Sequence, residues 1–360
     1  KVLLLYGFYV FMALLVFLLL NLILPQYKGF SGDWGFGTDD LYFFHQATGF
    51  NPVQDDGAPP VPFSSLGYNF SKFLRIFSLL VPYRIHLIDM LIFNIIPLVF
   101  IPHVLVKIAK KMFYADQHLK FLFSISAVCP FMMMNGLVLV RDVWVAFCFI
   151  LFLWGVVDKK PITAIVPLLL MAFLRFQAAG LAVSLGAVIL IFQVLEQYNF
   201  IREYLQRCFT GRRKYFSIAV IALVIIAGSI ILGTVMFRSH FLTEILVPDV
   251  AIKNRESVYH KIFNSAWYIR LPVGFVFFWG APFISLKNLY VNGIFVVRSV
   301  FEQAFGLIFL FYIPVYCKSL FDFFKKDTKW VTRGLHIAYL AGILILSQMS
   351  LQVRHKTMLM

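Results

Sequence analysis

The stretch "VRDVWVAFCFILFLWGVVDKKPITAIVPLLLMAFLRFQ", residues 140–177, contains two long apolar runs separated by three polar residues. Each run, 137–157 and 161–177, approaches the roughly 20 residues that a helix needs to cross the hydrocarbon core of a bilayer. The turn between them, "DKK" at 158–160, is short and basic. The pattern therefore predicts two membrane-spanning helices joined by a tight turn.

The same apolar character extends over the whole chain. Of its 360 residues, 61% are hydrophobic and only 14% are charged, and the mean hydropathy is +0.84. About a quarter of the residues of a soluble domain are charged, because its surface must face water. The composition therefore excludes an ordinary soluble domain. It predicts an all-α polytopic membrane protein that forms a single integral membrane domain over residues 1–360.

Apolar segments of spanning length predict about nine or ten transmembrane helices. The region 271–284 is apolar but short, and it is broken by two prolines and a glycine, so we expect it to be interfacial or re-entrant. The chain ends inside a new apolar run, "TMLM", so we expect it to be truncated at its C-terminus. The predicted spans are 2–24, 86–106, 119–135, 137–157, 161–177, 178–196, 216–236, 298–317 and 334–351.

The net charge of +15 orients these spans. Most of the excess of Lys and Arg lies in short connections, and basic connections stay in the cytoplasm. Positive charge therefore reports topology here, and we predict no nucleic-acid partner. Two long loops, 25–85 and 237–297, then lie on the external face, and we expect an interfacial amphipathic helix within 71–92. The basic connections are 107–120, 158–160, 197–215 and 318–333.

Three arginines fall at the external ends of predicted spans. Arg141 opens one span, Arg175 closes the next, and Arg354 follows the last. Each one alone is explained by snorkelling to lipid headgroups, or, for Arg141, by pairing with Asp142. Together they predict a cationic pocket for a lipid-linked monophosphate or diphosphate, because a guanidinium binds phosphate through two parallel hydrogen bonds. The neighbouring polar residues Gln177, His355 and Lys356 are assigned to the same pocket.

Two adjacent carboxylates, Asp39 and Asp40, stand in the first external loop, within "GFGTDDLYFFHQATGF" at 35–50. One interpretation is that they begin a helix near Leu41, with an N-cap supplied by Asp39 or the preceding threonine. The other is that one of them acts as a general base that takes a proton from a sugar hydroxyl. No cofactor is indicated. A divalent metal at this pair is a lesser alternative, because adjacent side chains diverge.

The second external loop mixes charged and aromatic residues. Arg255 and His260 are candidate ligands of a carbohydrate chain, together with aromatic rings that stack on sugar faces. Each single aromatic residue is better explained by the belt of Trp and Tyr that membrane proteins place at the interface.

These features resemble a known class of enzymes. The acidic, aromatic first loop, "GTDDLYFFHQA", resembles that of the GT-C class of membrane glycosyltransferases. The block "VRDVWVAFCFILFLWGVVDKKP", the following "LLLMAFLRFQ" and the late "FVFFWGAPF" and "VRHKTMLM" resemble bacterial polysaccharide polymerases of the Wzy or exopolysaccharide-polymerase type. The resemblance covers most of the chain in layout, through short motifs.

The resemblance implies a specific chemistry. Arg141, Arg175 and Arg354 would hold the diphosphate of an undecaprenyl-linked glycan, and Asp39 or Asp40 would be the acceptor base. The donor would be lipid-linked, since nucleotide sugars are absent outside the cytoplasm. The protein would lie in the bacterial cytoplasmic membrane, with its active face external and with other polysaccharide assembly proteins as possible partners.

Two other functions remain open from the sequence. A flippase that moves a lipid-linked oligosaccharide without chemistry would carry polar residues along a path through the membrane, whereas the predicted spans have few ionisable groups at their centres. A structural or assembly protein would not need arginines gathered on one face.

The predicted topology has a direct test. A cysteine introduced into loop 237–297 is expected to react with a membrane-impermeant thiol reagent added outside intact cells, because this loop is placed on the external face. Labelling that occurs only after the membrane is ruptured would overturn the orientation, and with it the external pocket.

Overall fold

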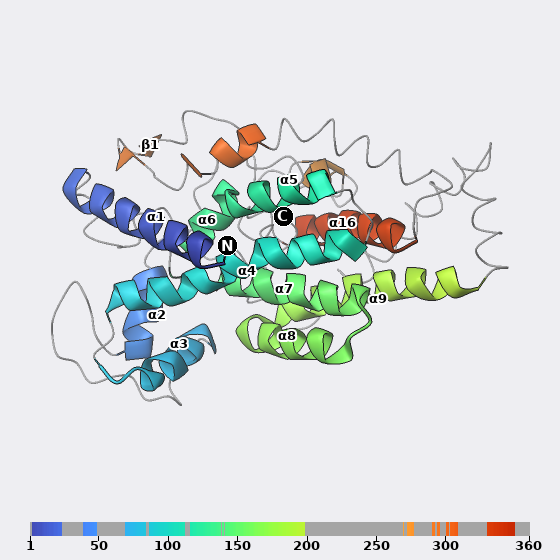
Figure 1. Cartoon of the computed structure of the whole chain (residues 1–360), viewed down its shortest axis with the longest axis horizontal. Coiled ribbons are helices and arrows are strands. Elements are labelled where there is room, and N and C mark those ends of the chain that lie inside the picture. Colours follow the sequence, from blue (N-terminus) through green and yellow to red (C-terminus); the bar gives the residue numbers. More distant parts are fainter. Residues whose placement is uncertain are drawn as a thin grey trace. The chain divides into compact units, whose positions relative to one another are not determined.

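The computed structural model is drawn in Figure 1, and its contacts divide the chain into two compact units. Unit 1 comprises 1–182 with 284–308, and unit 2 comprises 183–283 with 309–360. The single integral domain stays a prediction. The structure describes residues 2–23, 39–48, 69–83, 86–111, 116–137, 139, 141–198, 269, 272–276, 290–291, 294–295, 300–301, 303–308 and 330–349.

The predicted all-α class is confirmed for the described residues. The exception among them is a two-stranded antiparallel pair, β1 (Tyr290–Val291) with β2 (Ile294–Phe295). Within the same residues, Ile88–Lys111 is the one helical segment long and apolar enough to cross a membrane, by length and composition. The larger number of spans stays a prediction. The shorter apolar helical segments are Val2–Leu15, Asp142–Val157, Pro161–Leu174 and Ala178–Val194.

The predicted span 119–135 is divided into two helices. α5 (Asp116–Ala127) ends just before Pro130, and α6 (Pro130–Gly136) begins with that proline in its first turn. Proline lacks the N–H that would continue the earlier helix but suits the first helical position. The carbonyl of Ala127, at the end of α5, accepts a hydrogen bond of 2.6 Å from the Tyr9 hydroxyl. This bond attaches α1 (Val2–Ile23) to α5.

The predicted helical hairpin of residues 137–177 is present, with different ends. α7 (Asp142–Val157) and α8 (Pro161–Leu174) are joined by the turn 158–160, and α9 (Phe176–Gln197) follows directly. Lys160 donates its N–H to the Gly155 carbonyl at 2.8 Å, which closes the turn. The two helices pack closely at Gly155, where an added Cβ would lie 2.6 Å from the Thr163 carbonyl carbon. Glycine is therefore required for this close packing.

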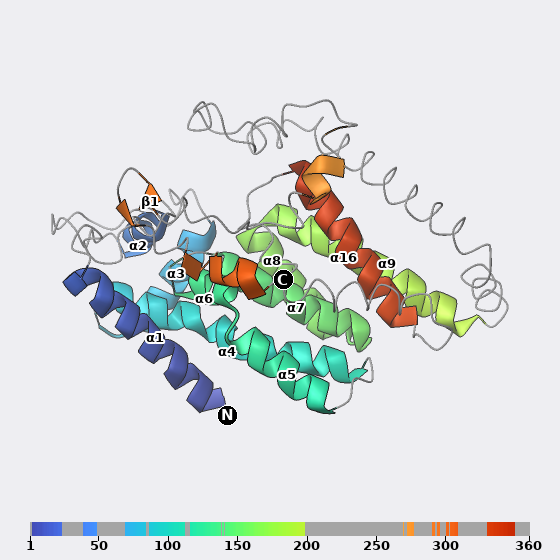
Figure 2. The same ribbon diagram turned by 90° about the horizontal axis from the view of Figure 1, so that it is seen from above.

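α4 (Leu87–Lys111) packs along α7, and α5 packs along α4, as both views of the ribbon show (Figures 1 and 2). One carboxylate ties the ends of three helices together. Asp158, after α7, lies 2.6 Å from Lys111 Nζ at the end of α4 and 2.7 Å from Lys160 Nζ before α8. The hydrogen bonds from Lys111 and then Lys160 hold the pKa of Asp158 below its usual value. The stabilisation that this carboxylate supplies is therefore present at neutral pH and is lost as the pH falls through its lowered pKa.

The first long loop contains two helices, α2 (Asp39–Thr48) and α3 (Asn69–Leu80), packed against each other. The helix predicted within 71–92 is confirmed up to Leu80, and its interfacial location stays a prediction. It does not continue into α4, because residues 81–83, which include Pro82, form a bend. Four rings join α3 to α4 and α7, with centroids 4.0–5.5 Å apart. This aromatic cluster is Phe73, Phe77, Phe93 and Trp144.

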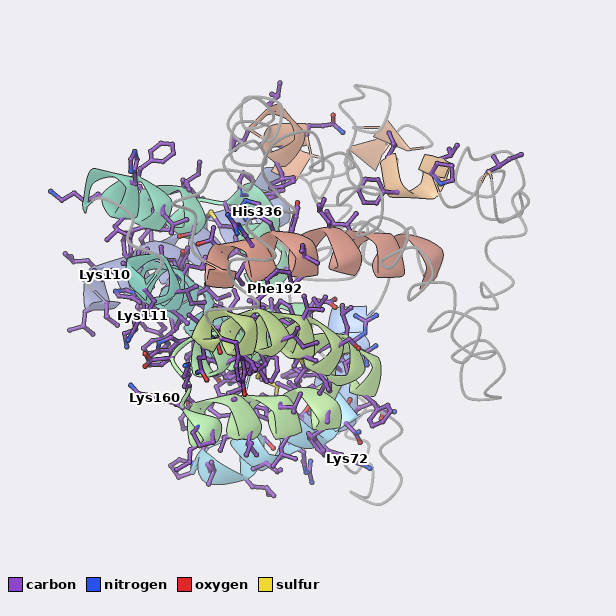
Figure 3. All side chains as sticks on the ribbon, turned by 90° about the vertical axis from the view of Figure 1, so that its right-hand side faces the viewer. Lys72, Lys110, Lys111, Lys160, Phe192 and His336 are labelled. Carbon is purple, nitrogen blue, oxygen red and sulfur yellow. The ribbon has the colours of Figure 1, made fainter. Side chains whose placement is uncertain are left out.

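Unit 2 contains α16 (Trp330–Met349) and the later part of α9. The two helices meet at Gly334, where an added Cβ would lie 3.3 Å from Ile189 Cα and 3.2 Å from Phe192 Cβ. Figure 3 labels Phe192 and His336 on these helices. The predicted span 216–236 and most of loop 237–297 lie outside the described residues. Residues 272–276 and 303–308, within the predicted segments 271–284 and 298–317, are helical.

Two glycines in similar helices provide a matched test of the hairpin packing. Gly155→Ala is expected to lower the free energy of unfolding by about 1–3 kcal/mol, because the methyl group would overlap the α8 backbone. At Gly180 an added Cβ would meet no atom of the described residues within 4 Å, so Gly180→Ala should leave stability unchanged or raise it by up to about 1 kcal/mol. Thermal unfolding in detergent measures both. Equal effects of the two substitutions would contradict the close packing at Gly155.

Candidate functional site

An ion pair closes the open end of the α7–α8 hairpin. Arg175 Nη1 lies 2.9 Å from Asp142 Oδ1, and the two side chains are only 15% and 11% exposed. Asp142 occupies the first turn of α7, and Arg175 is the residue that ends α8. Each charge is therefore opposite in sign to the helix dipole at its position. Because the two charges are paired, both can lie within an apolar bundle, where the burial of either charge alone would cost free energy.

The structure pairs Asp142 with a different arginine from the one that the sequence suggested. The sequence suggested that Arg141 pairs with its neighbour Asp142, whereas the carboxylate faces Arg175 across the hairpin. Arg141 holds the N-cap position of α7 without a side-chain capping bond. No hydrogen bond or ion pair of its guanidinium is found within the described part of the chain. A half-buried cation that has no partner among the described residues, next to a paired one, is suited to receive an anion.

α3 is fixed to the same end of the hairpin. Asn69 Nδ2 donates a hydrogen bond of 2.7 Å to the carbonyl of Phe173, in the last turn of α8. The last carbonyls of a helix lack partners within it, so this bond satisfies one of them. Phe173 is two residues before Arg175, so the start of α3 lies beside the ion pair.

α2 packs on α3 and is thereby held near the same end of the hairpin. The ring of Phe43 meets Phe70 edge-on, with centroids 5.1 Å apart, and Phe70 is the residue after Asn69. Arg75 Nη1 donates to the Ala47 carbonyl at 2.7 Å, in the last turn of α2. Phe43 lies one helical turn after Asp39 and Asp40. A chain of direct contacts therefore leads from the helix that carries the two carboxylates to the ion pair.

The acidic pair itself begins a helix. α2 starts at Asp39, two residues earlier than the sequence predicted, so both carboxylates stand in its first turn. Their placement suits the helix dipole, which stabilises the ionised form. Their side chains lie outside the described residues, so the role of general base stays a prediction.

The remaining candidates are placed only in part. Gln177 lies in the first turn of α9, two residues after Arg175, but its side chain is not among those described. The others belong to segments outside the described residues, and their assignment stays a prediction: Arg255, His260, Arg354, His355 and Lys356.

Trp144 is a member of this end of the bundle that the sequence did not single out. It lies two residues after Asp142, is only 8% exposed, and packs against Phe73 and Phe93. Its indole N–H has no hydrogen-bond partner among the described residues. A buried donor without a partner costs about 1–3 kcal/mol and calls for an explanation, such as a ligand. From the sequence alone, one tryptophan in an apolar helix is indistinguishable from ordinary core.

Within the described ranges, no three His, Cys, Asp or Glu side chains come together as a metal site requires. Comparisons with protein-family models, curated proteins and solved structures found no match to this chain.

The coupling between Asp142 and Arg175 can be measured with a double-mutant cycle. We expect a coupling free energy of about 1–3 kcal/mol between Asp142→Ala and Arg175→Ala, because either substitution alone leaves a mostly buried charge without its partner. Unfolding in denaturant, monitored by helix content, provides the free energies.

Arg141→Ala is the matched control in that cycle, since Arg141 is the other arginine at this end and has no partner among the described residues. Its coupling to Asp142→Ala should be near zero. A coupling as large as that of Arg175 would show that Asp142 is shared between the two arginines.

Proposed function

We propose that this protein is a membrane glycosyltransferase or polymerase that takes a sugar or oligosaccharide from a polyprenyl-linked phosphate or diphosphate. The observation that carries the proposal is the Asp142–Arg175 ion pair, with Arg141 in the same turn of α7. Two arginines at one end of an apolar bundle are a suitable receptor for a phosphate attached to a lipid. The limited exposure of the ion pair strengthens its electrostatic interactions with a ligand.

On the donor side, the arginines stabilise the leaving group. The bond between the anomeric carbon and the phosphate oxygen breaks, and the phosphate departs with the bonding electrons. Preorganised donors directed at the developing negative charge are an effective form of catalysis. A guanidinium carries five N–H donors, so an arginine that donates to a carboxylate through Nη1 can also donate to a phosphate. Asp142 is then a positioning residue that keeps Arg175 in place.

On the acceptor side, Asp39 or Asp40 takes the proton from a sugar hydroxyl. The oxygen of that hydroxyl forms the new bond to the anomeric carbon as the phosphate leaves, and the proton ends on the carboxylate. The contacts from α2 through α3 to α8 support this pairing of roles, because they bring the helix of the acidic pair to the arginine end.

The cellular setting follows from the arrangement of charge. The lysines near Asp158 lie at the end of α7 away from Asp142, separated by about 24 Å for a helix of 16 residues. A basic end that remains in the cytoplasm would place the arginine end on the external face. The proposed setting is the bacterial cytoplasmic membrane, in the assembly of a cell-surface polysaccharide.

The proposal is tested with purified protein and a synthetic undecaprenyl-diphosphate oligosaccharide. We expect a lengthened glycan and released undecaprenyl diphosphate. Asp39→Asn and Asp40→Asn identify the base, since an amide cannot accept the proton, and one of them should lower the rate by about 100-fold or more. Arg141→Ala should also slow the reaction without loss of helix content. Chromatography of the labelled glycan measures the product.

Asp89→Asn is the matched control for the acidic residues. Asp89 accepts the N–H of His86 at 2.8 Å at the start of α4, a role that an asparagine can also fill, and it should leave the rate unchanged. Movement of the lipid between leaflets without any product would replace the proposal with a flippase. Equal activity of all the aspartate variants would show that neither Asp39 nor Asp40 acts as the base.

A further inference from the structure

α8 presents a continuous apolar face outward. Five large side chains, at relative positions i, i+3, i+4, i+7 and i+11, are between 37% and 76% exposed. That spacing places them along one side of a helix. The opposite side of α8 packs on α7, where Gly155 allows close approach. This apolar stripe consists of Ile162, Ile165, Val166, Leu169 and Phe173.

The stripe begins directly beside a group of lysines. The lysine cluster is Lys107, Lys110, Lys111 and Lys160, all exposed, and Ile162 follows Lys160 by two residues. In Figure 3, Lys110, Lys111 and Lys160 lie on the same side of unit 1, and Lys72 lies apart from them. One face of unit 1 therefore combines the lysine cluster with the apolar stripe.

The lysine cluster is held in a defined geometry. Asp158 lies within 2.7 Å of both Lys111 Nζ and Lys160 Nζ, so one carboxylate keeps two ammonium groups close together. The Lys107 ammonium lies 4.4 Å from the centre of the Trp154 ring, and that of Lys160 lies 5.7 Å from it. Lysines outnumber the aspartate, so the cluster keeps a positive charge. Each ammonium has three donors, more than one carboxylate contact uses.

We propose that this face binds one anionic phospholipid, with the headgroup phosphate at Lys111 and Lys160 and an acyl chain along the apolar stripe. Basic pockets at helix ends attract acidic headgroups, and a tryptophan at the same level suits the membrane interface. The stripe from Ile162 to Phe173 rises about 16 Å, at 1.5 Å per residue. The stripe therefore offers an acyl chain an apolar surface along most of the length of α8.

The combination of the lysine cluster with the apolar stripe favours a lipid over other occupants. A soluble phosphate would use the lysines but would leave the stripe uncovered. A second copy of this chain would bring its own lysines to the same place and repel them. The inference rests on the membrane location in the proposed function, but not on the glycosyl transfer.

The test compares the lipids retained by the protein after detergent extraction from vesicles of three parts phosphatidylcholine and one part phosphatidylglycerol. We expect wild-type protein to retain phosphatidylglycerol in preference to phosphatidylcholine, by mass spectrometry of the bound lipid. Lys111→Gln with Lys160→Gln should weaken that preference by about 25-fold, because each lysine near an anionic headgroup contributes about fivefold. Lys111→Gln alone, which keeps more of the surface charge, should weaken it by about fivefold.

The control is Lys72→Gln with Lys120→Gln, which removes the same charge from α3 and α5 and should leave the preference unchanged. Glycerol phosphate, the headgroup without acyl chains, should not displace the lipid at millimolar concentration. Equal retention of both lipids, an equal loss in the control, or displacement by glycerol phosphate would overturn the site. A dimer cross-linked through cysteines placed at 165 and 169 would assign the stripe to a second copy.

The membrane location is checked separately by alkaline carbonate extraction of cell membranes. Protein that stays in the membrane but shows no lipid preference contradicts the lipid site alone. Protein released by carbonate contradicts the membrane location, and with it the proposed function as well.

Discussion

The arrangement of this bundle depends on one ion pair, which allows two charged side chains to lie among apolar helices. Asp142 and Arg175 stand at opposite helix termini of one hairpin, and each neutralises the other at 2.9 Å. The hairpin can bring them together because Gly155 lets α7 and α8 approach closely and because the turn at 158–160 is tight. Asn69 then fixes α3 to the last turn of α8. The positions of α3 and of α2, which packs on α3, thus follow from the same end of the hairpin.

The two ends of the hairpin have different chemistry. At one end a carboxylate is shared by two exposed lysines, and the surrounding surface remains cationic. At the other end, one arginine is paired and largely buried, and a second has no partner among the described residues. The first arrangement suits the headgroup of a lipid in the bilayer. The second suits a phosphate whose bond to a sugar is to be broken, because the cations there are oriented and partly removed from water.

Local patterns predicted much of this bundle. The apolar runs and the "DKK" turn predicted the hairpin, and the amphipathic pattern after residue 71 predicted α3. Helix ends were less predictable, since residues 137–141 lie outside α7 and Pro130 divides a predicted span. The partner of Asp142 could not be predicted, because it lies 33 residues away and depends on how two helices turn about their axes. The bond from Tyr9 to Ala127, across 118 residues, has no local signal either.

The arginine end of the bundle is proposed to receive a lipid-linked phosphate. A polyprenyl diphosphate that carries a photoreactive diazirine next to the diphosphate, cross-linked to the protein in membranes and mapped by mass spectrometry, locates the bound phosphate. Cross-links are expected within residues 69–77, 141–147 and 173–180, at the starts of α3 and α7 and around Arg175. Cross-links confined to 107–111 and 158–161 would place the substrate at the lysine end and exclude a substrate phosphate at the arginines.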